Sequence, residues 1–186
     1  MEYQRKLVSS SAPRNLTESS YLGAAPLVSS AAVLGVAAQI VTVEARHQTF
    51  IRAASQAAAV PSAFDTPLGV RSVFSLAAAF IDSCPPGSNL AITPFAAISM
   101  AGKEPTPIVA GSSLEMTTVA SGASFCSFTN GGLPGGSAFT AFDGKACTVP
   151  QNLAGETYVH LTSAGPLTGV LDDSIVVAGP VVIAIG

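Results

Sequence analysis

The spacing of hydrophobic positions changes near residue 100 and divides the chain into two parts. Before this point, apolar side chains recur at the three- and four-residue intervals of helices. After it, short runs rich in Thr, Val and Phe are separated by breaks that contain Gly and Pro, as in β-strands joined by turns. We therefore predict an α+β chain, with a helical domain in residues 1–103 and a strand-rich domain in residues 108–186.

Two helices are predicted in the first half of the helical domain. The first begins at a cap near residue 15 and reaches about residue 25, where Pro26 ends or kinks it. Ser29 or Ser30 caps the second, which spans about 31–56. Its residues are apolar over most of the helix circumference, which is typical of a helix in a bundle.

A third helix is predicted after Asp65-Thr66-Pro67. Asp65 or Thr66 is the expected cap, and Pro67 is expected at the first helical position, where its missing N–H costs nothing. The pattern stops before Cys84. An extended connection follows, and residues 104–107 have the composition of a stiff linker.

The second part predicts short strands at regular spacing. Turn residues such as Gly131–Gly136, Asp143-Gly144 and Gly165-Pro166 separate them. Strands of this length and spacing form small antiparallel sandwiches. The predicted strands lie near 108–119, 123–129, 137–142, 145–149, 156–162 and 174–185.

The charge of the chain excludes some functions. Only 10% of the residues are charged, against about 25% in average soluble domains, and the net charge is −3. So little positive charge, scattered along the sequence, gives no basis for binding nucleic acid. A low-charge surface rich in Ser, Thr and Gly is typical of secreted or wall-associated proteins. We therefore expect an extracellular or cell-wall location, although residues 1–15 are polar and contain no visible signal peptide.

A long uncharged stretch in residues 19–43 raises the question of a membrane span. The stretch contains Pro26, Gly35 and Gln39, and it runs directly into Glu44. A buried helical hairpin broken at Pro26 explains these residues better, so no membrane span is expected.

Three cysteines and one sequon bear on the compartment. Cys126 and Cys147 both lie in the strand-rich part and form the favoured disulfide in an oxidising compartment, which leaves Cys84 as a free thiol. Three buried, reduced cysteines are the alternative. Asn15 begins an Asn-Leu-Thr sequence, which is a glycosylation site if the chain is secreted, as in a glycoprotein.

Glu44 and His47 are three residues apart, a spacing that would let both side chains act at one site. Residues three apart on a helix face the same side, so the carboxylate and the imidazole converge. Di-iron and di-manganese carboxylate bundles use such a Glu-x-x-His pair from each of two helices, with a single Glu from each of two others. The pair occurs by chance in many helices, but its place within an apolar helix raises its significance, because a buried carboxylate needs a partner.

Longer stretches around this pair carry a resemblance. The sequence reads YLGAAP at residues 21–26, IVTVEARH at 40–47 and FIR at 50–52, and then FDTPL at 64–68 and VFSLA at 73–77. These stretches closely resemble the fungal and bacterial ferritin-like family, which includes nutritional-stress-response and desiccation-related proteins. The resemblance covers residues ~15 to 100, and the strand-rich part resembles, less distinctively, the β-domain appended in fungal members.

The resemblance implies a helical ferritin-like half-bundle followed by a small antiparallel β-sandwich. Family members place their ligands on four helices in the order Glu, Glu-x-x-His, Glu, Glu-x-x-His, and only the second pair of helices can be found here. The single Glu of that pair usually occupies the place where this sequence has Arg14. Glu18, one helical turn later, is therefore the third candidate ligand beside Glu44 and His47.

Two functional hypotheses follow from this half-site. In the first, the chain is a non-catalytic secreted or cell-wall-associated stress protein with a degenerate site and no cofactor, in which Glu44 has a structural role. In the second, two chains pair and complete a di-iron or di-manganese site. Half a bundle leaves an apolar face uncovered, so we expect a homodimer or other homo-oligomer formed through residues 31–56. The sandwich would contact a cell-wall or surface partner.

The remaining candidates are weaker. His160 lies on an alternating strand and is expected at the surface, and Asp172-Asp173 is expected to be a solvated turn rather than a calcium site. The sequence contains no nucleophile elbow and no phosphate-binding loop, so hydrolase and nucleotide-binding functions have no support.

Overall fold

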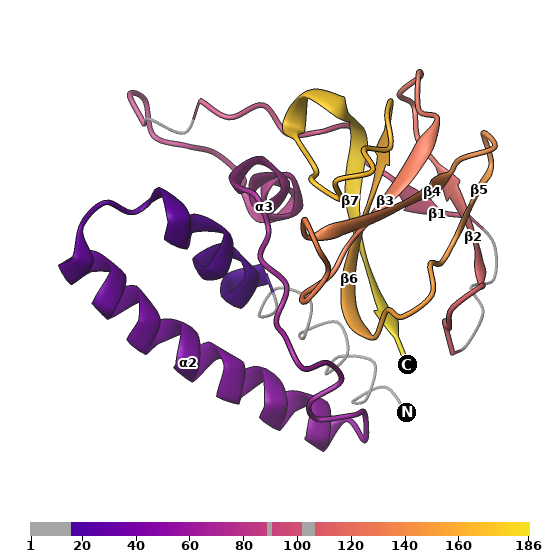
Figure 1. Cartoon of the computed structure of the whole chain (residues 1–186). Helices are drawn as coiled ribbons and strands as arrows, with labels where there is room; N and C mark the ends of the chain where they lie inside the picture. Colours follow the sequence, from indigo (N-terminus) through magenta and orange to yellow (C-terminus); the bar gives the residue numbers. More distant parts are fainter. Residues whose placement is uncertain (1–15, 89–90, 102–106) are drawn as a thin grey trace.

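The computed structural model describes residues 16–88, 91–101 and 107–186, and confirms the α+β class (Figure 1). The described chain forms three layers. Helical segments lie against one face of a four-stranded sheet, and a three-stranded sheet covers the other face. The predicted sequon at Asn15 lies outside the described residues.

The first two helices lie where the sequence predicts them. Residues 16–24 are helical and continue into the short 3-10 helix η1 (Ala25–Leu27), which contains Pro26. The long helix α2 (Ala31–Ala54) is capped by Ser30, whose hydroxyl accepts a hydrogen bond of 3.4 Å from the Val33 N–H. In the described part of the chain, no helix is long and apolar enough to cross a bilayer.

The start of the third helix was predicted wrongly. Helix α3 (Val70–Ala77) begins after Gly69, without a side-chain cap, and passes into η2 (Ala78–Phe80). Thr66 caps no helix because its hydroxyl is used elsewhere. It donates to the Glu156 carbonyl at 3.1 Å and accepts from the Gly131 N–H at 2.9 Å, and both groups belong to the β-region.

Residues 64–68 form a strap that connects the helical layer to the sheets. The Leu68 N–H donates to the Ser19 carbonyl in the first helix at 3.1 Å. On this side, a Cβ added at Gly23 would overlap the Leu68 backbone. On the other side, a Cβ added at Gly131 would overlap the carbonyls of residues 64 and 65. The strap thus lies between two glycines that let the backbones approach closely.

Both sheets are antiparallel, and all six predicted strands are present. The four-stranded sheet has the order β4-β3-β6-β7, and the three-stranded sheet has the order β1-β2-β5. Strand β1 was not predicted; it lies before the expected domain boundary at 103/108, yet it pairs with β2. That boundary remains a prediction. The strands are β1 (Ser99–Met100), β2 (Ser113–Thr117), β3 (Phe125–Thr129), β4 (Ser137–Ala141), β5 (Ala146–Thr148), β6 (Gly155–Thr162) and β7 (Val176–Ile185).

The core lies between the two sheets. Leu114 and Met116 of β2 pack with Phe128 of β3 and with Val159 and Leu161 of β6. Apolar burial of this kind contributes about 25 cal/mol per Å² and is the main force that holds the sheets together. Residues that alternate with Val159 and Leu161 along β6 point to the opposite face of the sheet, which the helical layer covers.

A disulfide also connects the two sheets. Cys126 on β3 and Cys147 on β5 lie with their sulfur atoms 2.04 Å apart, and both side chains are fully buried. Cys84 is a free, exposed thiol.

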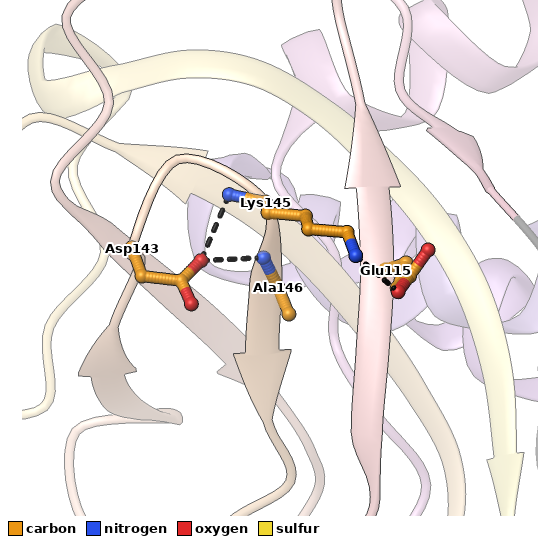
Figure 2. Close-up of polar contacts among 4 residues, drawn as sticks. All are labelled: Glu115, Asp143, Lys145 and Ala146. Atoms are coloured by element: carbon orange, nitrogen blue, oxygen red, sulfur yellow. Dashed lines mark hydrogen bonds and ion pairs between the residues drawn. The ribbon is translucent and has the colours of Figure 1, made fainter.

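The turn before β5 is shaped by Asp143 (Figure 2). One carboxylate oxygen of Asp143 accepts hydrogen bonds from the N–H groups of Lys145 at 2.8 Å and Ala146 at 2.7 Å. These two backbone hydrogen bonds lower the pKa of the Asp143 carboxyl. The Lys145 ammonium reaches across to Glu115 on β2 at 2.8 Å, an exposed ion pair that fixes side-chain position more than it stabilises the fold.

Candidate functional site

Glu44 and His47 lie together on α2. The His47 Nδ1 atom is 3.5 Å from a Glu44 carboxylate oxygen, as the three-residue spacing predicts. The His47 side chain is 53% exposed and that of Glu44 is 25% exposed. These two residues therefore offer one nitrogen and one carboxylate at a partly open surface.

Glu18 has a different partner. Its side chain, in the helical segment 16–24, is buried and forms a hydrogen bond with the Asp65 carboxyl. Burial raises the pKa of Glu18 to about 8, helped by this hydrogen bond and by repulsion from Asp65, Glu156 and Glu44. A buried carboxyl with a pKa raised to about 8 is largely uncharged at neutral pH, and an uncharged carboxyl is a poor ligand for a cation.

The residues of one chain do not fit the dinuclear metal centre that the resemblance implies. A ferritin-like site needs several carboxylates and histidines that converge on one point. In the part of the chain that the structure describes, no three His, Cys, Asp or Glu side chains are grouped so that they could hold a metal ion. Glu44 and His47 form a pair, whereas Glu18 faces Asp65.

Glu18 instead belongs to a cavity between the helical layer and β6. The cavity has a volume of about 160 Å³. Its walls come from the first helix, from the face of α2 that carries Gln48 and Arg52, from residues 59–66, and from Glu156 on β6. The cavity therefore gathers polar side chains from four separate segments.

Glu156 on β6 is a half-buried acid in the wall of this cavity. Its carboxylate accepts a hydrogen bond from the Tyr158 hydroxyl at 2.8 Å, and that hydroxyl is also 2.8 Å from the Ser19 hydroxyl. Burial raises the pKa of Glu156 to about 7, although the Tyr158 hydrogen bond and the charge of Arg52 oppose the shift. The chain of groups from Ser19 to Glu156 connects the first helix to the sheet.

Sequence reasoning did not find Gln48, Asp65 or Glu156 as members of one site. Asp65 was interpreted as a helix cap, and Glu156 is far from it in sequence. The one local signal was the Glu156–Tyr158 spacing, which places two polar tips on one face of a strand.

The expectation that His160 is exposed was wrong. Its side chain is fully buried, with Nε2 at 2.9 Å from the Ser72 hydroxyl of α3 and the Phe95 ring packed edge-on at 6.4 Å. Burial lowers the pKa of His160 to about 3, and its Nδ1 atom has no hydrogen-bond partner among the described residues. The Ser72–His160 pair has the distance of a nucleophile and its base, but within the described part of the chain no acid orients the imidazole. The pair connects α3 to the sheet.

Asp172 forms a turn, as the sequence indicates. Its carboxylate accepts hydrogen bonds from the backbone N–H and the hydroxyl of Ser174 at the start of η3 (Asp173–Ile175). These bonds lower its pKa. The Asp172 carboxylate is thus used within its own turn, as expected for a turn residue.

Comparison with known proteins relates only the helical part to a family. Residues 9–57 match the model of the ferritin-like domain, about a quarter of the chain. The match ends just after α2 and includes Glu18, Glu44 and His47. It supports a relationship to the ferritin-like family for this segment. No curated protein matches the sequence significantly.

Proposed function

We propose that this chain is a non-catalytic ferritin-like protein of the extracellular space or cell wall, with a degenerate metal site. The observation that carries the proposal is the position of Glu18, whose carboxyl is bound to Asp65 and buried. A ligand position that is used to join the helical layer to the strap serves the fold rather than a metal. In this proposal Glu44 and His47 are a surface remnant of the family site.

Four further features support the proposed location and role. The disulfide between Cys126 and Cys147 would persist in an oxidising compartment, and the low charge suits a wall-associated protein. The β-sandwich gives a rigid platform for contact with a wall or surface partner. The stress role rests on the resemblance of residues ~15 to 100 to stress-response members of the family.

Metal content tests this proposal directly. Protein purified without chelators and then supplied with iron or manganese should retain less than about 0.1 ion per chain by elemental analysis, because a stable site needs a complete ligand set. His47→Ala should leave this value and the fold unchanged. About one ion per chain that is lost in His47→Ala would overturn the proposal.

A second candidate function has its own supporting observation. The outer face of α2 carries exposed apolar side chains beside Glu44 and His47, among them Val33, Val36 and Phe50. Two chains that pair through this face would bring two Glu-x-x-His pairs together and could complete a di-iron or di-manganese carboxylate centre. Such a homodimer would cover the face and supply the missing ligands at once.

Sedimentation velocity distinguishes the candidates. If the α2 face pairs, Phe50→Asp should shift a dimer to monomer and abolish metal retention. Phe80→Asp is the matched control, because Phe80 is 76% exposed and Phe50 is 74% exposed, but Phe80 lies on η2. A metal-free dimer would support the first proposal with self-association, whereas a monomer would leave no route to a shared site.

A further inference from the structure

The helical hairpin, defined as residues 16–54, is docked on the sheets through few buried side chains. Those that are buried are Glu18, Ser19, Gln48 and Ile51, and of these only Ile51 is apolar. Gln48 and Ile51 lie in the last two turns of α2, whereas the start of α2 lies away from both sheets (Figure 1). Apolar burial is the main force that holds packed elements together, and here it is small. Docking of the hairpin therefore depends strongly on polar contacts.

These polar contacts converge near the start of the hairpin. The Ser19 hydroxyl is 2.8 Å from the Tyr158 hydroxyl, which donates a hydrogen bond of 2.8 Å to the Glu156 carboxylate on β6. The neighbouring Glu18 forms a hydrogen bond with the Asp65 carboxyl of the strap. Two adjacent residues of the hairpin thus attach it to the sheet and to the strap.

The Glu18–Asp65 hydrogen bond makes this joint sensitive to pH. A carboxylate accepts hydrogen bonds but cannot donate them, so two carboxyls bond to each other only while one of them carries a proton. Burial raises the pKa of the docked Glu18 carboxyl to about 8 from an ordinary value of 4.5. A pKa that is higher in the docked than in the released state means that release gives up a proton. Docking is therefore strongest below pH 4.5 and weakens as the pH rises to about 8.

The charges around Glu18 leave this effect in place. Among the described residues that line the cavity, Arg52 alone carries a positive charge, and its Nε donates to the Ala58 carbonyl at 2.8 Å. The charge of Arg52 lowers the pKa of Glu156 but does not outweigh burial, which raises it to about 7. The titratable and charged groups that face Glu18 come from the strap, β6 and α2, and are Asp65, Glu156, Tyr158, Glu44 and Arg52.

We propose that this joint is a pH-sensitive latch, which holds the helical hairpin on the sheets in acid and loosens it as the pH rises into the mildly alkaline range. Ionisation of Glu18 places its carboxylate against Asp65 and Glu156, and these charges separate when the hairpin moves into water. The two sheets remain joined by their disulfide, and α3 remains on the sheet through its packing against β7. The inference does not depend on whether the chain binds metal.

Hydrogen–deuterium exchange measured by mass spectrometry tests the latch in the full chain. Amides of residues 16–54 are compared with those of β3 and β6 from about pH 5 to about pH 8, after correction for the intrinsic exchange rate at each pH. Protection of the hairpin should fall at least about tenfold over this range, because ionised Glu18 disfavours docking. At the upper pH, the hairpin amides should exchange at least about tenfold faster than those of β3 and β6, since the sheets stay folded when the hairpin is released.

Variants of the acids make the result specific. The double variant Glu18→Gln, Glu156→Gln removes the titrating groups and keeps the side-chain shapes, so the protection of its hairpin should change less than about threefold over the same range. Glu115→Gln is the matched control, because it makes the same substitution at an exposed glutamate on β2. Asp65→Asn removes the charge that faces Glu18 from the strap and should also reduce the fall in protection; it decides the matter if the double variant does not fold. Protection that stays constant with pH in the wild-type protein, an undiminished fall in the glutamine or asparagine variant, or hairpin and sheet amides that exchange at one rate at the upper pH would each overturn the proposal.

Discussion

Replacing His160 should change how the stability of the protein depends on acid. The imidazole is fully buried, and its pKa is lowered to about 3 from an ordinary value of 6.5. A folded-state pKa below the unfolded value means that the unfolded chain takes up the proton first. The stability that depends on neutral His160 is therefore complete above pH 6.5 and is lost as the pH falls toward 3.

The magnitude follows from the size of the shift. Each pKa unit corresponds to about 1.4 kcal/mol, so the loss should reach about 3 kcal/mol at pH 4.5 and at most about 5 kcal/mol near pH 3. This is a large part of the 5–15 kcal/mol by which domains of this size are stable. In His160→Gln this loss is absent, because glutamine does not titrate, although the variant is less stable at neutral pH.

Urea unfolding between pH 4.5 and 7.5 measures the effect. The chain has no tryptophan, so far-UV circular dichroism should follow the transition. The difference in unfolding free energy between the wild-type protein and His160→Gln should shrink by about 3 kcal/mol over this range. His47→Gln is the control, because it makes the same substitution at an exposed histidine on α2. A difference that stays constant with pH, or an NMR titration of His160 near pH 6.5, would refute the reasoning.

Three further predictions concern other contacts. The pKa of Glu156 is raised to about 7, so the free energy of unfolding should fall as the pH rises from 4.5 to 7. Glu156→Gln should flatten this dependence on pH in urea titrations. An unchanged dependence would contradict the raised pKa. Gly131→Ala should destabilise the protein by about 1–3 kcal/mol, because the new Cβ would overlap the strap. The control Gly35→Ala, in open space on α2, should stabilise the protein by about 0.5–1 kcal/mol. Equal effects of the two substitutions in thermal melts would argue against a tight contact at the strap. Replacing both Cys126 and Cys147 by alanine should lower the free energy of unfolding by about 3 kcal/mol, because the disulfide closes a loop between residues 21 positions apart. An unchanged urea midpoint would show that the bond does not form.

The elements of the fold could be predicted because their signals are local. Apolar residues surround most of α2, and Ser30 caps its first turn. Gly and Pro mark the breaks between strands. Each of these signals lies within a few residues of the element that it specifies. Strand β1 was missed because two residues carry no periodicity of their own, and only pairing with β2 makes them a strand.

The errors come from contacts between distant segments. Alternation along β6 indicates two faces but not what covers each, and α3 buries the face that carries His160. Thr66 has the composition of a cap, yet its hydroxyl is engaged by Gly131 and Glu156. Likewise, Glu18, Asp65 and Glu156 meet only after folding, so no spacing in the sequence could group them.

The strap between Gly23 and Gly131 has a consequence for how this protein can change over evolution. Residues 64–68 fit the helical layer on one side and the β3–β4 loop on the other, and each fit requires a residue without a side chain. A ferritin-like segment spliced onto another sandwich would lose the second glycine, and a sandwich grafted onto another helical partner would lose the first. The two halves are therefore expected to be inherited together and to diverge as a unit, even though one half is helical and the other is rich in strands.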